Sequence, residues 1–505
     1  MTDNARTAPL ELSPDEFRRL GHRLVDRLAD FLASLPSRPV TRNDSPSSIR
    51  AVIGNGPLPA SGAAPAALLD EAVDVLVEHS LFNGHPRFMG YITSSAAPIG
   101  TLGDLLASAV NPNTGAWILS PAASSIEAQA VRWIAELVGY PSSCGGLLVS
   151  GGNMANFVGF LAARASRAPW KVRERGLRDG PGPLTAYVSK ATHTWIHKAA
   201  DLFGLGTDAI RWIPVDGRQR MDVTALERQL ASDREQGNVP FIVVGTAGTV
   251  EVGAIDPLGD IAAVCRERGL WFHVDGAYGA PAAVLPEAPD DLKSLALADS
   301  VAIDPHKWLY AALEAGCVLV RDPHALVRTF SYRPDYYFFD GSDQEAPINY
   351  FEHGFQNSRG FRALRVWLAL RHAGRDGYVQ LIRDDVALAR QLFDAVDSTP
   401  ELEAVTHSLS ITTFRFVPRD LAGRGEDAGA YLNDLNRALL ERVQAGGELF
   451  VSNAVVDGTF LLRACIVNFR TTAADVAAVP GIVVRLGREL DATMRPDALR
   501  GFASA

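Results

Sequence analysis

From about residue 125 onward, short apolar runs alternate with longer amphipathic segments, and this alternation limits the possible folds more than any other feature. The apolar runs are TAYVS, AIRWIPV, FIVVGT, LWFHVD, SVAID and GCVLVRD, and helical stretches such as 223–232 and 257–268 separate most of them. Runs this short and uniformly apolar are typical of strands buried on both faces. We therefore predict an α/β domain with a largely parallel sheet, whose site lies at the C-terminal ends of the strands.

The composition is that of a globular protein with more than one structural unit. The chain has 505 residues, of which 47% are hydrophobic and 21% are charged, so it can bury a large core. Its net charge of −10 does not favour a nucleic-acid surface. The four cysteines lie far apart without metal-binding or redox spacing, and we expect them to be reduced: Cys144, Cys265, Cys317 and Cys465.

The first residues lack the basic start and apolar run of a signal peptide. Elsewhere, charged residues interrupt each apolar run well before the ~20 residues that cross a bilayer. We therefore expect a cytoplasmic protein that does not bind a membrane.

A long amphipathic helix is predicted over residues 13–35. Ser13 can cap it, Pro14 suits the first turn, and Glu16 can complete a capping box. Because no nearby segment can cover its apolar stripe, we expect the helix to pack on another domain or a second subunit. The stripe consists of Phe17, Leu20, Leu24, Leu28, Phe31 and Leu35.

The remaining segments complete the outline. Residues 36–66 are rich in Pro, Ser, Gly and Ala and are predicted to form a loop, followed by a helix at about 67–81. The aromatic and polar stretch 323–357 has no periodicity, so we expect a functional lid or a region ordered by a partner chain. A helix at 360–373 follows. Strands near 410–417 and 460–467 then indicate a smaller α/β unit.

Two apolar segments, one ending in an aspartate and the other in a lysine, indicate the chemistry. LWFHVDGAYGA ends its strand at Asp275, and ADSVAIDPHKW brings Lys307 to the end of the next. A lysine amine can form a Schiff base with the aldehyde of pyridoxal 5′-phosphate (PLP), while a carboxylate keeps the pyridine nitrogen protonated. Either residue alone would more often be a surface lysine or a helix-capping acid. Together, in this setting, they favour the cofactor.

Two further features can be placed around a PLP ring. The segment LLVSGGNMANF runs from a strand through a Gly-Gly turn into a helix, whose free N–H groups could hold a phosphate. Such turns are commonly only structural. His193 follows the strand at 186–190 and could stack on the ring, or it could be a capping or core histidine. His193 and His197 also have the spacing of a metal pair, but no HExxH glutamate or evident third ligand accompanies them.

These residues together resemble the group II PLP-dependent amino-acid decarboxylases, the family of aromatic-L-amino-acid and glutamate decarboxylases. The signatures HVDxAY and PHKW carry the resemblance, which covers most of the chain, through LLRACIVNFRTT. It implies PLP fold type I, the aspartate aminotransferase-like fold, with a mostly parallel seven-stranded sheet. It also implies three parts: an N-terminal helical dimerisation segment (1–97), a large PLP-binding domain (98–375) and a small C-terminal α/β domain (376–505).

The resemblance also implies roles for individual residues. Lys307 would be the Schiff-base lysine and Asp275 the partner of the pyridine nitrogen. His193 would stack on one face of the ring and Ala277 would pack on the other. The phosphate would be held by Gly152, Asn153, Met154 and His306.

A catalytic tyrosine on a mobile loop of the family matches Tyr336, which would give the stretch 323–357 its role. A tyrosine on a closing lid can protonate the α-carbon after CO₂ leaves and can exclude water and oxygen. Tyr332, Tyr337 and Tyr350 are rival candidates, and an aromatic loop anchor is the structural alternative.

The chain departs from the family pattern at three positions. Asp304 precedes Pro305-His306-Lys307 where many members have Asn, and Val250 occupies a place often filled by Thr. Gly360 follows Arg359 where a second Arg is common. No reacting group is lost, but the Val250 change puts one cofactor hydrogen bond in doubt.

The expected reaction is decarboxylation of an L-amino acid to an amine, with an aromatic amino acid as the favoured substrate. By resemblance, the substrate pocket includes Tyr91, Ile92 and Thr93, with Asn113, Gly115 and Trp117 reaching across from a second subunit of a homodimer. Tyr91 favours an aromatic substrate over glutamate, whereas Asn83 and Gly115 replace bulky aromatics and make the pocket roomier or more polar. The alternatives are an aldehyde synthase on the same scaffold and a decarboxylase of acidic amino acids, which would need an arginine in the pocket.

Overall fold

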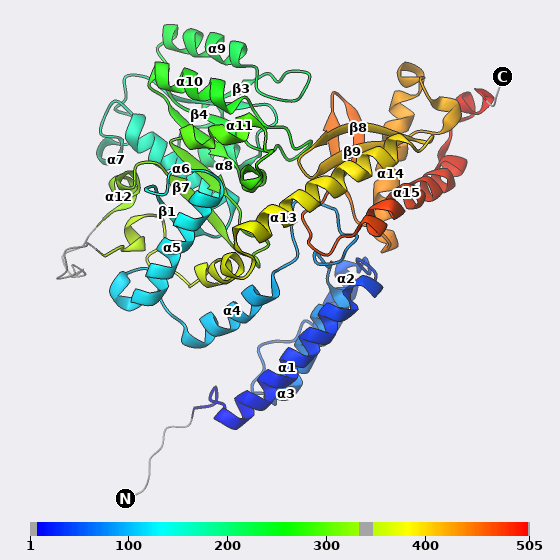
Figure 1. Ribbon diagram of the computed structural model, residues 1–505, viewed down its shortest axis with the longest axis horizontal. Helices are drawn as coiled ribbons and strands as arrows, with labels where there is room; N and C mark the ends of the chain where they lie inside the picture. Colours follow the sequence, from blue (N-terminus) through cyan, green and yellow to red (C-terminus); the bar gives the residue numbers. More distant parts are fainter. Residues whose placement is uncertain (1–7, 333–346, 503–505) are drawn as a thin grey trace, which may run out of the picture.

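The computed structural model describes residues 8–332 and 347–502 and contains two sheets (Figure 1). The larger sheet has seven strands in the order β1-β7-β6-β5-β4-β2-β3. Strands β2 to β6 pair in parallel, while β7 is antiparallel to both of its neighbours. The strands are β1 (Gly145–Val149), β2 (Leu184–Ser189), β3 (Ile210–Ile213), β4 (Val239–Thr246), β5 (Trp271–Asp275), β6 (Ser300–Ile303) and β7 (Gly316–Val320). The predicted strands and the mostly parallel sheet are thus confirmed.

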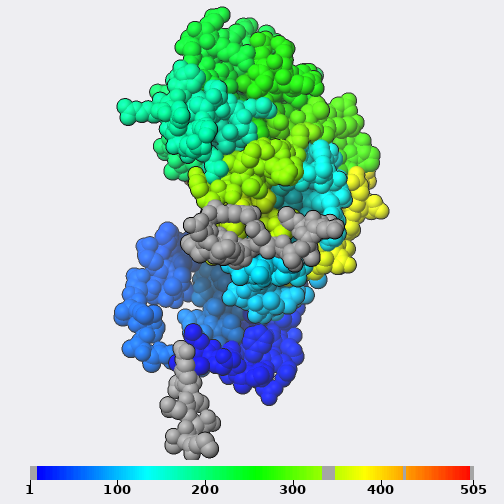
Figure 2. All heavy atoms as spheres, turned by 90° about the vertical axis from the view of Figure 1, so that its left-hand side faces the viewer, coloured from blue at the N-terminus to red at the C-terminus, as the bar shows by residue number. Residues whose placement is uncertain are grey.

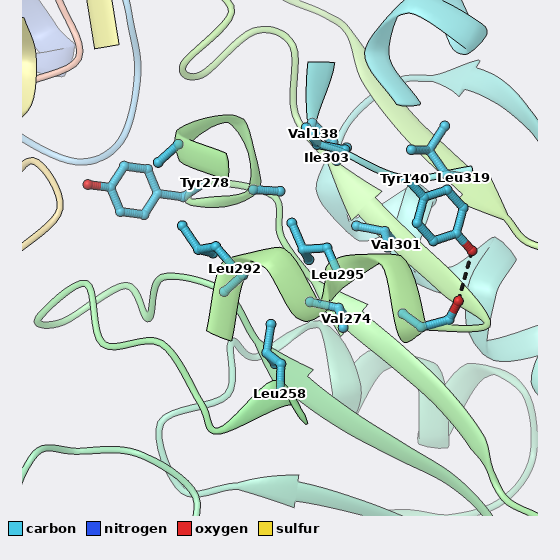
Figure 3. Packing of buried hydrophobic residues seen from close by; sticks show 14 of the residues in the cluster. Val138, Tyr140, Leu258, Val274, Tyr278, Leu292, Leu295, Val301, Ile303 and Leu319 are labelled. Atoms are coloured by element: carbon cyan, nitrogen blue, oxygen red, sulfur yellow. Dashed lines mark hydrogen bonds between the residues drawn. The ribbon is translucent and has the colours of Figure 1, made fainter. Parts of the chain in front are cut away.

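Helices cover both faces of this sheet, which explains why its strands are apolar throughout. One face packs against α5 (Pro121–Leu137), α9 (Val223–Glu235) and α10 (Leu258–Arg268). The other packs against α6 (Gly152–Arg167), α8 (Trp195–Leu202) and α12 (His324–Phe330). Figure 3 shows the first of these cores, where the Tyr140 hydroxyl donates to the carbonyl of Ala298. The short helices α7 (Val172–Arg175) and α11 (Asp290–Lys293) complete this region.

The smaller sheet is antiparallel, with the order β10-β11-β9-β8. Its strands are β8 (Leu402–Ser408), β9 (Ile411–Phe416), β10 (Ser452–Val456) and β11 (Thr459–Cys465). The helices α14 (Gly425–Gly446) and α15 (Ala473–Met494) pack beside it and share a separate buried core with it. Each core is a contiguous cluster of apolar side chains, as expected for two structural units.

One long helix, α13 (Ala363–Asp397), contacts α5 of the large unit and β8 and β9 of the small one. The helix predicted at 360–373 is therefore much longer than expected. Gly374 has non-helical φ and ψ angles within it (φ 64°), so the chain bends there and continues as a helix into the small unit. The proposed domain boundary at 375 lies at this bend, and the boundaries remain predictions.

The N-terminal helices form an arm beside the main body. Helices α1 (Pro14–Ser34) and α3 (Pro65–His79) lie side by side, as Figure 1 shows, and the blue N-terminal segments gather at one end of the molecule in Figure 2. The Ser13 side chain accepts a hydrogen bond from Glu16 N, which confirms the predicted cap. Helix α4 (Pro98–Val110) then leads into the large unit.

Two predicted loops contain helices. Helix α2 (Pro46–Ile53) lies within 36–66 because Ser45 accepts a hydrogen bond from Ser48 N and Pro46 suits a first turn. Helix α12 lies within 323–357. Within the described ranges, no helix has the length and apolar character needed to span a bilayer.

Candidate active site

A cavity of about 310 Å³ opens at the C-terminal ends of strands β1, β4, β5 and β6. This is the sheet edge at which α/β proteins bind ligands. Its walls include every predicted cofactor-binding residue except His306. They include Ile92, Gly152, Asn153, Met154, His193, Thr246, Val250, Asp275, Ala277, Tyr278, Asp304, Lys307 and Glu314.

Lys307 reaches the cavity from a tight turn that follows β6. Its backbone N–H donates to the carbonyl of Asp304 (2.8 Å). Its ammonium Nζ lies 3.0 Å from Asp304 Oδ2. The lysine side chain is 21% exposed, whereas the side chain of Asp304 is 3% exposed. The amine is thus accessible from the cavity, and a buried carboxylate holds it from one side.

Asp275 ends β5 as predicted and is almost fully buried. Its Oδ2 accepts a hydrogen bond from the indole Nε1 of Trp195 (2.8 Å), and its Oδ1 accepts one from Ala277 N (3.2 Å). Neither donor is charged, so the carboxylate remains free to pair with a cation in the cavity. The protonated nitrogen of a pyridine ring is such a cation.

His193 lies beside this carboxylate, on the loop between β2 and α8. Its Nδ1 accepts a hydrogen bond from Trp195 N (3.3 Å), which orients the ring. The cavity walls partly desolvate the imidazole and lower its pKa, while Asp275 acts in the opposite direction. A neutral, fixed imidazole suits the predicted stacking role. His197 instead packs against Trp212 (ring centroids 4.8 Å apart), and no metal-binding group of three His, Cys, Asp or Glu occurs among the described residues.

The glycine turn between β1 and α6 provides a space that larger residues would fill. A Cβ atom at Gly152 would lie 2.7 Å from Asp304 Oδ2 and 3.3 Å from the Ala277 side chain. Gly152 is also the first residue of α6, so free backbone N–H groups face this space. This turn therefore remains the predicted phosphate site. His306, whose Nδ1 accepts from Ala315 N (3.2 Å), lies near the same turn, since a Cβ at Gly151 would be 3.2 Å from its Cε1.

A buried ion pair supports this turn from behind. Arg359 Nη2 lies 2.5 Å from Glu127 Oε1, and both side chains are inaccessible to solvent. Glu127 accepts a hydrogen bond from Leu148 N (2.9 Å), and Arg359 donates to Leu148 O (2.6 Å). Leu148 lies in β1, just before the glycine turn, so the pair holds the strand that positions α6.

The predicted substrate residues lie in different places. Ile92 lines the cavity, whereas Tyr91 is about half exposed and has a left-handed backbone (φ 51°). The Thr93 hydroxyl is buried without a hydrogen-bond partner. Trp117 does not line the cavity of its own chain. Tyr336 lies outside the described residues.

Gly115, noted from the sequence as a replacement for a bulky aromatic, approaches the backbone of Asn357. A Cβ at Gly115 would overlap the carbonyl oxygen of Asn357. The glycine is therefore required by the close approach of two backbone segments, and a larger side chain would need the backbone to shift.

Sequence reasoning did not single out Arg463. Its side chain is buried in β11, its Nη1 donates to the carbonyl of the cavity residue Val250, and its Nε has no hydrogen-bond partner. Burial lowers its pKa, whereas the nearby carboxylate of Glu251 acts in the opposite direction. A lone arginine within the apolar run TFLLRAC was the available signal, since buried charges normally have a partner or a ligand.

The fold and the cavity define a PLP-dependent α/β enzyme: a lysine and an aspartate at adjacent strand ends, with a glycine turn that begins a helix beside them. Comparison with known proteins agrees. Residues 58–417 match the model described as the pyridoxal-dependent decarboxylase conserved domain. The chain belongs to this family and is a PLP-dependent amino-acid decarboxylase.

Three relatives illustrate the likeness. The chain is 32% identical to an aromatic-L-amino-acid decarboxylase of Bacillus atrophaeus, over 95% of this chain and 97% of that protein. It is 29% identical to a phenylacetaldehyde synthase of a Rosa hybrid cultivar, over 90% of each. The crystal structure of Oryza sativa TDC with PLP and tryptamine superposes with a TM-score of 0.88 at 28% identity, covering 96% of this chain and all of that one.

Proposed function

We propose that this enzyme decarboxylates an aromatic L-amino acid to its amine, with Lys307 as the attachment point of PLP. The supporting observation is that Lys307, Asp275, His193 and the glycine turn line one cavity. When bound, PLP supplies an electron sink for the pair released as the Cα–carboxylate bond breaks.

Each residue has a defined part in this proposal. The Asp275 carboxylate pairs with the pyridine nitrogen, and the Trp195 indole keeps that carboxylate in place. His193 packs on the ring and orients the substrate, while the start of α6 binds the phosphate through its N–H groups. Tyr336 is the proposed proton donor to the α-carbon, as the family resemblance implies.

An aromatic side chain is the favoured substrate group. Ile92 contributes apolar surface to the cavity, and Tyr91 packs near Phe450 (ring centroids 5.9 Å apart). The similarity to the Bacillus atrophaeus enzyme, at 32% identity, extends over 95% of this chain. Tyr91 directly precedes the lining residue Ile92, and an aromatic side chain in that place can favour aromatic ligands through offset or edge-to-face contacts.

Release of CO₂ from each of the twenty L-amino acids tests the proposal. We expect tryptophan, tyrosine, phenylalanine or DOPA, assayed beside the twenty, to give the highest kcat/KM, with amine and CO₂ in equal amounts. Lys307→Ala should lose both turnover and the absorbance near ~420 nm of the covalently bound cofactor. Turnover undiminished in Lys307→Ala would disprove the lysine assignment. Peroxide and aldehyde formed in place of amine would instead identify an aldehyde synthase.

A second candidate is a decarboxylase of acidic amino acids, and Arg463 supports it. A buried guanidinium with a free Nε beside the cavity wall is suited to pair with a carboxylate. If it binds the substrate's side chain, glutamate, aspartate or cysteine sulfinate should be preferred. Arg463→Lys should then retain part of the acidic activity that Arg463→Met loses. Equal loss of aromatic activity in both variants would instead indicate a general role in the fold.

We also propose that the functional unit is a homodimer in which Trp117 reaches the partner's cavity. Apolar side chains on the arm and on α4 support this, because several are half or more exposed in the single chain. They include Phe17, Leu68, Leu76, Leu102, Leu105, Leu106 and Val110.

A further inference from the structure

Asp304 is a buried carboxylate with one unused oxygen in the wall of the cavity. It is only 2% exposed, and its Oδ2 lies 3.0 Å from Lys307 Nζ. Its Oδ1 is buried and accepts no hydrogen bond.

The backbone holds Asp304 and Lys307 together. The hydrogen bond from Lys307 N to Asp304 O closes the turn that joins them (2.8 Å). On the other side, Gly152 leaves room for the carboxylate, since a Cβ there would lie 2.7 Å from Oδ2. The carboxylate therefore has little freedom to turn away from the ammonium group.

Among the described carboxylates, only Asp304 lies within ion-pair distance of Lys307. Asp275, the other buried acid of the cavity, accepts hydrogen bonds from Trp195 and Ala277. Burial lowers the pKa of both His193 and His306, which favours their neutral forms at neutral pH. The titratable groups that face the lysine turn or line the cavity are His193, Asp275, Tyr278, Asp304, His306 and Glu314.

We propose that Asp304 is the counter-ion that holds Lys307 as an ammonium before the cofactor arrives, and so limits how fast the lysine reacts with an aldehyde. This rests on the proposed function, in which Lys307 is the attachment point. To react, the ammonium must first release one proton. The amine nitrogen then bonds to the aldehyde carbon, and the carbonyl oxygen leaves as water. A nearby carboxylate opposes the first of these steps. Asp304 is thus a positioning residue that acts through Lys307.

Asp304→Asn keeps the size of the side chain and removes its charge. In cofactor-free enzyme, we expect its rate of covalent attachment at neutral pH to rise about tenfold. The carboxylate that opposes release of the proton is absent in this variant. Absorbance after rapid mixing measures the rate. Asp304→Ser serves as a second variant, and thermal unfolding of each cofactor-free protein checks its folding.

Two aldehydes distinguish an effect of Asp304 on the lysine from an effect on the phosphate of the cofactor. PLP carries a phosphate, whereas pyridoxal has the same aldehyde without it. If Asp304 acts on Lys307, the variant should speed both reactions by a similar factor. A faster reaction with PLP alone would mean that Asp304 repels the phosphate, and this would overturn the inference. Unchanged rates with both probes would also overturn it.

A matched control is available elsewhere in the chain. Asp290 and Lys293 form an ion pair with the same three-residue spacing (2.7 Å) on the exposed surface. Asp290→Asn should leave both rates unchanged. Borohydride reduction followed by peptide mass spectrometry of wild type identifies the labelled residue. A label absent from Lys307 would refute the proposed function, whereas a label on Lys307 with unchanged Asp304→Asn rates would refute only the role of Asp304.

Discussion

At the scale of single residues, the cavity contains two aspartates with different partners. Asp275 accepts hydrogen bonds from two uncharged donors, whereas Asp304 faces the lysine ammonium. A carboxylate whose existing partners are neutral can still stabilise a positive charge that a ligand brings. This difference in environment is why we assign Asp275 to the cofactor ring and Asp304 to the lysine.

Asp275→Asn tests that assignment. The amide cannot stabilise a protonated ring nitrogen, so we expect kcat to fall by at least ~100-fold, equivalent to about 2.7 kcal/mol of transition-state stabilisation. The Trp195 indole can still donate to the amide oxygen, so the fold should persist. Steady-state kinetics and circular dichroism measure the two effects. A wild-type kcat in this variant would mean that another group supports the ring.

At the scale of elements, two contacts position the site: the start of α6 and the link between α13 and the lysine turn. On α13, Asp385 accepts hydrogen bonds from Trp308 Nε1 (2.8 Å) and from the Tyr310 hydroxyl (2.7 Å). Trp308 directly follows Lys307 in the chain, and Tyr310 lies two residues after Trp308. The long helix therefore holds the turn that presents the lysine, although it lies far from it in sequence.

Gly152→Ala tests the start of α6. The added methyl group would press on the Asp304 carboxylate and on Ala277, so we expect PLP to bind about tenfold more weakly, equivalent to about 1.4 kcal/mol. Gly481→Ala is the control, because a Cβ at this helical glycine of α15 meets nothing within 4 Å. Titration of each cofactor-free protein with PLP gives the affinities. Equal affinity in the two variants would contradict the proposed phosphate site.

Asp385 predicts a pH dependence of stability. Burial raises its pKa from 3.8 to about 7. The folded state therefore holds a proton that the unfolded state has lost between about pH 4 and pH 7. Stability should fall as pH rises through this window, by at most about 1.4 kcal/mol per pH unit from this group. In Asp385→Asn this component should vanish. Chemical unfolding at a series of pH values measures it, and an identical slope in the variant would exclude Asp385 as the source.

At the scale of the whole molecule, the N-terminal arm leaves apolar surface uncovered. Arg23 and Arg27 of α1 pair with Asp70 of α3, so the two helices are joined on one side. Phe17 and Val25 nevertheless remain 56% and 42% exposed. An arm with uncovered apolar residues is expected to pack on a second copy of the chain.

Replacing Phe17 and Val25 together by Asp should weaken the proposed dimer, because two charges would be buried at its interface. Sedimentation should give twice 54.2 kDa for wild type and a smaller average mass for the variant at low concentration. Leu297→Asp is the control, since Leu297 is equally exposed (50%) but lies on the large unit. A wild-type protein that sediments as a monomer would contradict the proposal.

The sheet, its mostly parallel strands and the strand-end positions of Asp275 and Lys307 could all be predicted from the sequence. This was possible because apolar periodicity and the C-terminal ends of strands are local properties of the chain. The sequence did not show that α13 continues to Asp397 or that α2 forms within a Pro- and Ser-rich segment.

Which distant side chains meet is visible only in the folded molecule. Arg463 donates to the carbonyl of Val250, Asp385 holds the turn after Lys307, and the Glu127–Arg359 pair supports β1. Each of these contacts joins segments far apart in sequence. They depend on how the helices and the two sheets pack together, which a local sequence pattern does not show.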